Sequence, residues 1–77
     1  MNTAQIEILP KRGEWIVKIN DDTYIGPYSY EAAMVTAIAL ADAAWQLGSH
    51  PSVILQDRKG ERRVVWDHPN QRHEIYA

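Results

Sequence analysis

The stretch SYEAAMVTAIALADAAWQLGSHP, residues 29–51, decides the fold of this 77-residue chain. Ser29 is a suitable N-cap because its hydroxyl can accept a hydrogen bond from a free amide of the first turn, and Glu31 complements the positive end of the helix dipole. Gly48 can end the helix as the C′ residue, and Pro51 prevents its continuation. The stretch therefore predicts a capped helix.

On a helical wheel at about 100° per residue, the apolar side chains fill one continuous half with alanines at its centre. The members of this half are Tyr30, Ala33, Met34, Ala37, Ile38, Leu40, Ala41, Ala44, Trp45 and Leu47. A row of alanines lets a helix approach a sheet closely, so we expect this half to face a sheet. A membrane span needs about 20 apolar residues, and this segment is shorter and carries Asp42, so we expect no membrane anchor.

On the opposite half of the helix, Glu31, Asp42 and Gln46 form a polar stripe. The positions beside this stripe are poor in charge, at Val35, Ala39 and Ala43. Alanine is the best helix former, which is one explanation. The alternative is a contact surface for a protein partner or for a second copy of the chain in a homodimer.

Four further segments have strand character, and a fifth is ambiguous. Alternating or β-branched residues predict strands at 4–9, 14–20, 52–56 and 61–67, joined in pairs by the turns PKRG and DRKG. Residues 23–28, TYIGPY, form either a short third strand interrupted by Gly26 and Pro27 or a loop.

The order strand, strand, short strand, helix, strand, strand predicts an α+β fold: a small two-layer domain with one alanine-rich helix on one face of an antiparallel sheet. We expect a single domain over residues 1–67 and a loosely held C-terminal tail over residues 68–77.

The composition argues against two classes of protein. The net charge is −2 and the chain has no cysteine, which argues against a nucleic-acid binder driven by bulk charge and against thiolate metal sites. No segment resembles a secretory signal, so we expect a cytoplasmic location.

No constellation of catalytic residues is evident, so we expect neither an enzyme nor a cofactor. The three histidines, His50, His68 and His73, match no zinc-binding spacing and are interpreted as loop or tail residues. A metal site or hydrolase built on His68 and His73 is the alternative.

Basic residues gather at the two predicted turns: Lys11 and Arg12 at the first, Arg58, Lys59, Arg62 and Arg63 at or after the second. If residues 23–28 form a strand, both turns lie at the same end of the domain; if they form a loop, the turns lie at opposite ends. The first case makes a compact basic patch able to meet phosphates or an acidic protein, and the alternative is ordinary solubilising turn chemistry.

The three tryptophans, Trp15, Trp45 and Trp66, lie on inward-facing positions of predicted elements. Core packing is the default interpretation. Trp66, close to the tail, is the candidate for a partly exposed interface anchor, because tryptophan dominates binding hot spots.

The segments PKRGEWIVKI and SYEAAMVTAIALADAAWQLGSHPSVIL resemble two groups of small proteins over most of residues 8–56. One is a family of uncharacterised bacterial domains, matched at Trp15 and Val17, at Ser29, Glu31 and Ala32, and at Gly48, Val53 and Ile54. The other is the phage-encoded anti-CRISPR proteins, and this resemblance implies a non-catalytic inhibitor that binds a CRISPR surveillance complex.

Together these features predict a non-enzymatic protein-binding domain, an inhibitor of a host defence complex encoded by a bacteriophage or prophage. The alternative is a nucleic-acid-associated domain that uses the basic turns.

Overall fold

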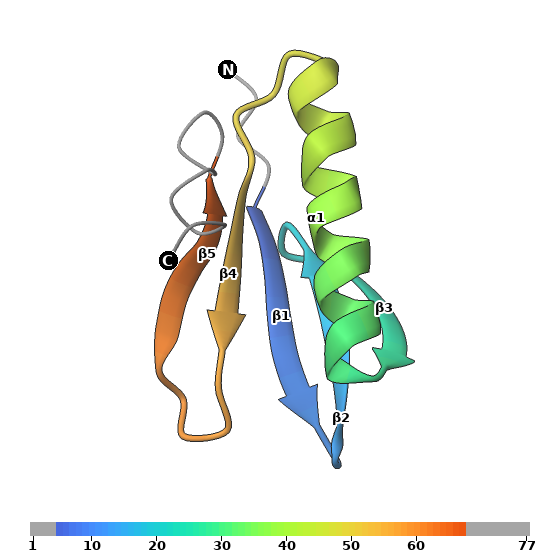
Figure 1. The fold of residues 1–77 in the computed structure, drawn as a ribbon, viewed down its shortest axis with the longest axis vertical. Coiled ribbons are helices and arrows are strands. Elements are labelled where there is room, and N and C mark those ends of the chain that lie inside the picture. The colour runs from blue at the N-terminus through green and yellow to red at the C-terminus, as the bar shows by residue number, and fades with distance from the viewer. Residues whose placement is uncertain (1–4, 68–77) are drawn as a thin grey trace.

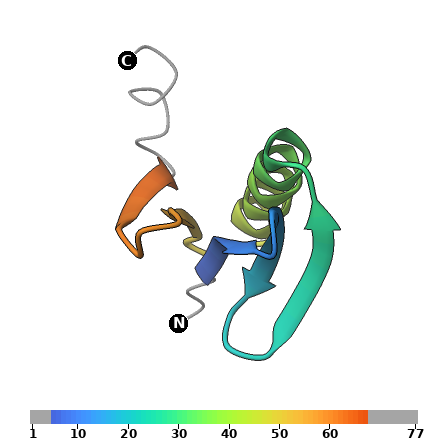
Figure 2. The same ribbon diagram turned by 90° about the horizontal axis from the view of Figure 1, so that it is seen from below.

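The computed structural model describes residues 5–67, which form one helix packed on one five-stranded sheet (Figure 1). The elements are β1 (Gln5–Lys11), β2 (Glu14–Ile19), β3 (Thr23–Tyr28), α1 (Tyr30–Gln46), β4 (Ser52–Gln56) and β5 (Arg62–Asp67). Seen from below, the helix lies on one side of the sheet, with β3 and β5 at the two edges (Figure 2). The predicted two-layer α+β fold is confirmed, and residues 23–28 are a strand.

The strand order is β3-β2-β1-β4-β5, and the sheet is mixed. The three pairs joined by hairpins are antiparallel, but the central pair of β1 and β4 is parallel. The prediction of an antiparallel sheet is therefore wrong for this central pair. Parallel neighbours need a long crossover connection. The helix supplies it, because α1 carries the chain from the end of β3 back to the start of β4.

Both predicted helix caps are confirmed. Ser29 Oγ accepts a hydrogen bond from the Ala32 amide at 3.2 Å. At the other end Gly48 has φ +94°, its amide donates to the Trp45 carbonyl at 3.0 Å, and the Ser49 amide donates to the Ala44 carbonyl at 3.0 Å. These two bonds are the Schellman pattern, which satisfies the last carbonyls of the helix.

The core lies between the helix and the central strands. Ala33, Ala37 and Ala41 are fully buried and pack in one cluster with side chains from β1, β2, β4 and β5, among them Ile8 and Val53. The predicted alanine row therefore faces the sheet. Within residues 5–67 no helix is long and apolar enough to cross a membrane.

The first hairpin turns later in the sequence than the motif PKRG suggests. β1 continues through Pro10, and the turn consists of Arg12 (φ 53°) and Gly13 (φ 84°). Positive φ at both central residues identifies a type I′ turn, which matches the twist of the flanking strands. Pro10 fits in β1 because the pairing with β4 ends at Ile8, so no ladder bond to β4 is lost there.

We predict that Ala37→Leu destabilises the fold by about 1–3 kcal/mol or prevents folding, because the alanine has no room for a larger side chain against the sheet. Ala39→Leu, on the exposed side of the same helix, is the matched control and should stay within about 0.5 kcal/mol of wild type. Urea unfolding followed by circular dichroism measures both. Equal effects of the two substitutions would contradict the packing described here.

Candidate functional site

Both basic turns lie at the same end of the domain (Figure 1). β1 and β4 are parallel neighbours, so the hairpins that follow them turn at the same edge of the structure. β3 runs in the same direction, and the N-terminus of α1 therefore lies at this end too. We call the residues Lys11, Arg12, Arg58, Lys59, Arg62 and Arg63 the basic end; it contains all the basic residues that the sequence singled out.

The first turn presents Arg12 in a conformation that arginine rarely adopts. Its φ of 53° lies in the left-handed region, which is unfavourable for side chains with a Cβ and is best tolerated by glycine and asparagine. Lys11 and Arg12 are both exposed. The turn thus carries a solvated charge at a position where backbone preference alone favours asparagine.

The second turn is held together by the carboxylate of Asp57. Its Oδ1 accepts hydrogen bonds from the Lys59 amide at 2.9 Å and from the Glu61 amide at 3.0 Å, and the Gly60 amide donates to the Asp57 carbonyl at 3.0 Å. The Asp57 carboxylate is therefore hydrogen-bonded to backbone amides of the turn. The side chains of the neighbouring Arg58 and Lys59 are exposed.

A row of three side chains links the second turn to the first hairpin and to the helix. The Arg58 guanidinium carbon lies 5.0 Å from the centre of the Trp15 ring on β2. The edge-to-face contact of Trp15 with Tyr30, at the start of α1, has ring centres 5.1 Å apart. Both geometries are favourable, so the two turns are connected through side chains as well as through the sheet.

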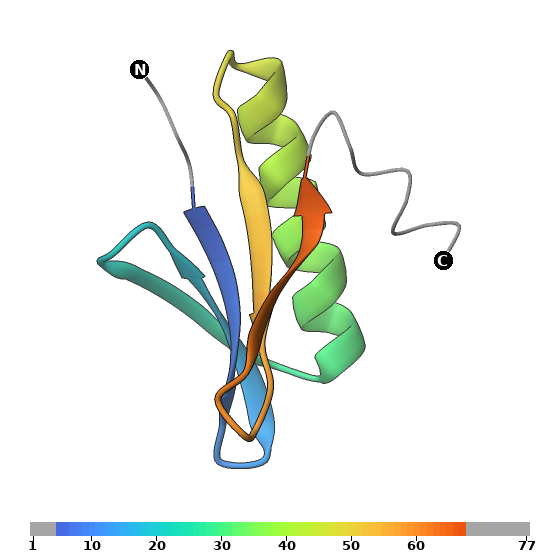
Figure 3. The same cartoon turned by 90° about the vertical axis from the view of Figure 1, so that its left-hand side faces the viewer.

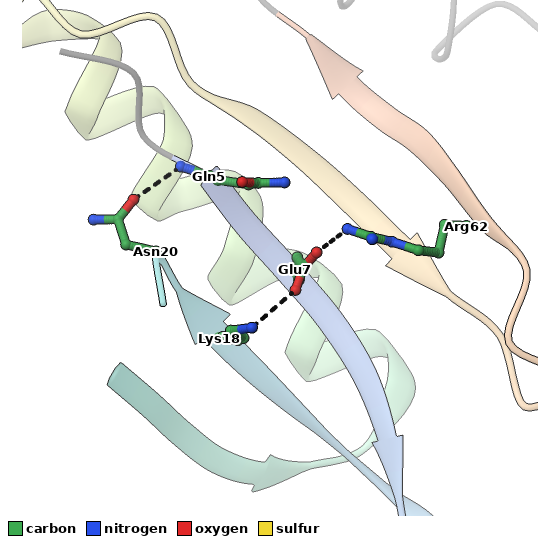
Figure 4. Close-up of polar contacts among 5 residues, drawn as sticks. All are labelled: Gln5, Glu7, Lys18, Asn20 and Arg62. Carbon is green, nitrogen blue, oxygen red and sulfur yellow. Dashed lines mark hydrogen bonds and ion pairs between the residues drawn. The ribbon is translucent and has the colours of Figure 1, made fainter. Parts of the chain in front are cut away.

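Arg62 has a different role from its neighbours at the basic end. It pairs with Glu7 on the face of the sheet that the helix does not cover (Figure 4). Lys18 Nζ lies 3.6 Å from the other oxygen of the same carboxylate, whose side chain is only 11 % exposed. Arg62 is therefore paired within the fold although its side chain is 48 % exposed. Arg63 is also exposed and forms no ion pair in the described part of the chain.

The remaining predicted site residues lie apart from the basic end. Val35, Ala39 and Ala43 are exposed on the outer side of α1, which both interpretations of these residues predict. Trp66 is only 6 % exposed because its partner in the ladder, Val53, faces the helix. The default interpretation of Trp66 as a core residue is therefore confirmed, and the alternative of a partly exposed anchor is wrong.

The histidines are placed only in part. His50 is exposed, with its ring 5.8 Å from that of Trp45 in an edge-to-face contact. His68 and His73, like the predicted tail 68–77, lie outside the described residues. Among residues 5–67 no three His, Asp or Glu side chains are grouped so as to hold a metal ion.

Two features of the structure were not predicted from the sequence: the ion pairs of Glu7 in the middle of β1 and the contact between Arg58 and Trp15. Glu7 alternates with Ile6 and Ile8 as an outward-facing strand residue would. Glu7 is buried because β1 has a neighbouring strand on each side. The sequence could have indicated this only if the parallel pairing of β1 with β4 had been recognised.

We predict that Glu7→Gln destabilises the domain by about 1–3 kcal/mol, because it leaves Lys18 and Arg62 without the carboxylate that both contact. Glu14→Gln is the matched control: Glu14 is exposed, and its replacement should change stability by less than about 0.5 kcal/mol. Chemical denaturation of both variants tests this. An unchanged unfolding midpoint for Glu7→Gln would show that the ion pairs contribute nothing.

Comparison with models of protein families, with curated proteins and with solved structures finds no match to this chain.

Proposed function

We propose that this chain is a non-enzymatic protein-binding domain whose basic end contacts an acidic surface of its partner. The observation that carries the proposal is the gathering of Lys11, Arg12, Arg58 and Lys59 from two hairpins at one end (Figure 1). In the described part of the chain, none of these four residues forms an ion pair. Their charges are available to a partner.

Three features favour a protein over a nucleic acid as this partner. Carboxylates lie among the cations, at Glu14 and Glu61, and would repel a continuous phosphate backbone. The isoelectric point of about 5.8 is far below that of typical nucleic-acid-binding domains. Arginine and tryptophan, which meet here at Arg58 and Trp15, are the residues most enriched at protein interface hot spots.

The resemblance to anti-CRISPR proteins supports a partner class. We infer an inhibitor that acts in the cytoplasm of a bacterial host by occupying a CRISPR surveillance complex. An inhibitor of this kind needs a stable surface and no chemistry, and a small domain with one charged end satisfies that requirement. Association driven by such a patch is fast and depends on salt.

We predict that adding the purified domain prevents one type of CRISPR surveillance complex from binding target DNA in a gel-shift assay. The double variant Arg12→Asn with Lys59→Gln, which removes two positive charges, should weaken this inhibition by about tenfold or more. The matched control, Val35→Glu with Ala39→Glu, changes the net charge equally on the outer side of α1 and should inhibit like wild type.

The reverse pattern, with loss of inhibition only in the helix variant, would move the binding surface to Val35 and Ala39. If no surveillance complex is inhibited and the domain itself binds the DNA with an affinity that falls steeply with salt, the function is nucleic-acid binding.

A further inference from the structure

A cleft of about 610 Å³ lies beside the first hairpin and is lined by residues of β2 and of its neighbour β3, and we call it the β2–β3 cleft. Ile16, Tyr24 and Pro27 are among its lining residues, as are the exposed and charged Lys11, Arg12 and Glu14, which we call its rim. Its position follows from the twist of the sheet, which turns the β2–β3 hairpin away from β4 and β5 (Figure 3). The volume lies in the range of about 300–1,000 Å³ that is typical of ligand sites.

The walls of the cleft are fixed by contacts within the sheet. A Cβ on Gly26 would lie 3.2 Å from the Trp15 carbonyl oxygen and 3.3 Å from Ile16 Cα, so β3 lies as close to β2 as it does because residue 26 is glycine. Lys18 Nζ lies 6.0 Å from the centre of the Tyr24 ring. Tyr24 is nevertheless 56 % exposed, an unusually large aromatic surface to leave in water.

Pro27 limits what can bind here. It is in the edge strand β3 and has no amide hydrogen, so this part of the edge cannot extend a sheet with an added strand. The cleft therefore suits a single side chain of a binding partner that packs against its apolar residues. Polar groups of the partner next to that side chain would then contact the charged residues at the rim. Lys11 and Arg12 make the rim more positive than negative despite Glu14.

We propose that the β2–β3 cleft binds an acidic peptide segment of the partner that carries one aromatic side chain. The aromatic ring packs against Ile16, Tyr24 and Pro27, and the neighbouring carboxylates pair with Lys11 and Arg12. Charge complementarity at the rim selects acidic over basic segments. This inference rests on the proposed function, since it names the part of the partner that the basic end recognises.

The test is a titration of the full ¹⁵N-labelled chain with the synthetic peptide acetyl-Asp-Glu-Asp-Trp-Glu-Asp-Glu-amide, followed by amide chemical shifts. We expect the largest shifts at Ile16, Tyr24 and Gly26. Replacing the peptide's tryptophan with alanine, or Tyr24→Ser in the protein, should each weaken binding by about tenfold. Val64→Ser is the matched control, because Val64 is an exposed apolar residue of the other edge strand, and it should bind like wild type.

Absence of binding, shifts confined to other elements, or equal binding by wild type and Tyr24→Ser would overturn the cleft assignment. A version of the peptide with lysine at every acidic position should not bind, and binding by that version would also overturn it. These outcomes are separable from failure of the proposed function. If Tyr24→Ser still inhibits a surveillance complex and Arg12→Asn with Lys59→Gln does not, the basic end acts without the cleft.

Discussion

The parallel pairing of β1 and β4 is the constraint on which the rest of this structure depends. It brings the two hairpins, which are separated by the whole length of α1 in the sequence, side by side in one sheet. The pairing needs a crossover helix that lies close to the strands, and the buried alanines of α1 allow that approach. A helix with large side chains at Ala33, Ala37 and Ala41 could not lie as near the sheet.

Both polar features of the domain follow from that pairing. Because β4 lies beside β1, Arg62 of β5 can reach across β4 to Glu7, which Lys18 contacts from the other side. Because the two hairpins turn at the same end, Arg58 can lie over Trp15 of β2. One arrangement of strands thus neutralises a carboxylate that is almost buried and leaves the five other cations of the basic end together at the surface.

Local signals predicted much of this fold. The N-cap Ser29 and the C′ residue Gly48 act within one turn of the helix, so the residues alone identify both ends. The alternation of Ile6, Glu7 and Ile8 predicts a strand in the same way. The direction of pairing between β1 and β4 is not a local property, because it depends on how many times the chain reverses direction between the two strands. For the same reason the two turns could be placed at one end only on the condition that residues 23–28 form a strand. The inward-facing position of Trp66 in its predicted strand indicates core packing, and the structure confirms it.

The arrangement of the two turns can be measured directly in solution. The chain has no cysteine, so Lys59→Cys provides a single position for a nitroxide spin label at the tip of the second hairpin. Paramagnetic broadening falls steeply with distance from the label. The structure predicts stronger broadening of the Arg12 and Gly13 amides than of the Asp21 and Asp22 amides, which lie at the far end of β2. Stronger broadening at Asp21 and Asp22 would mean that β4 runs antiparallel to β1, and it would contradict both the fold and the basic end.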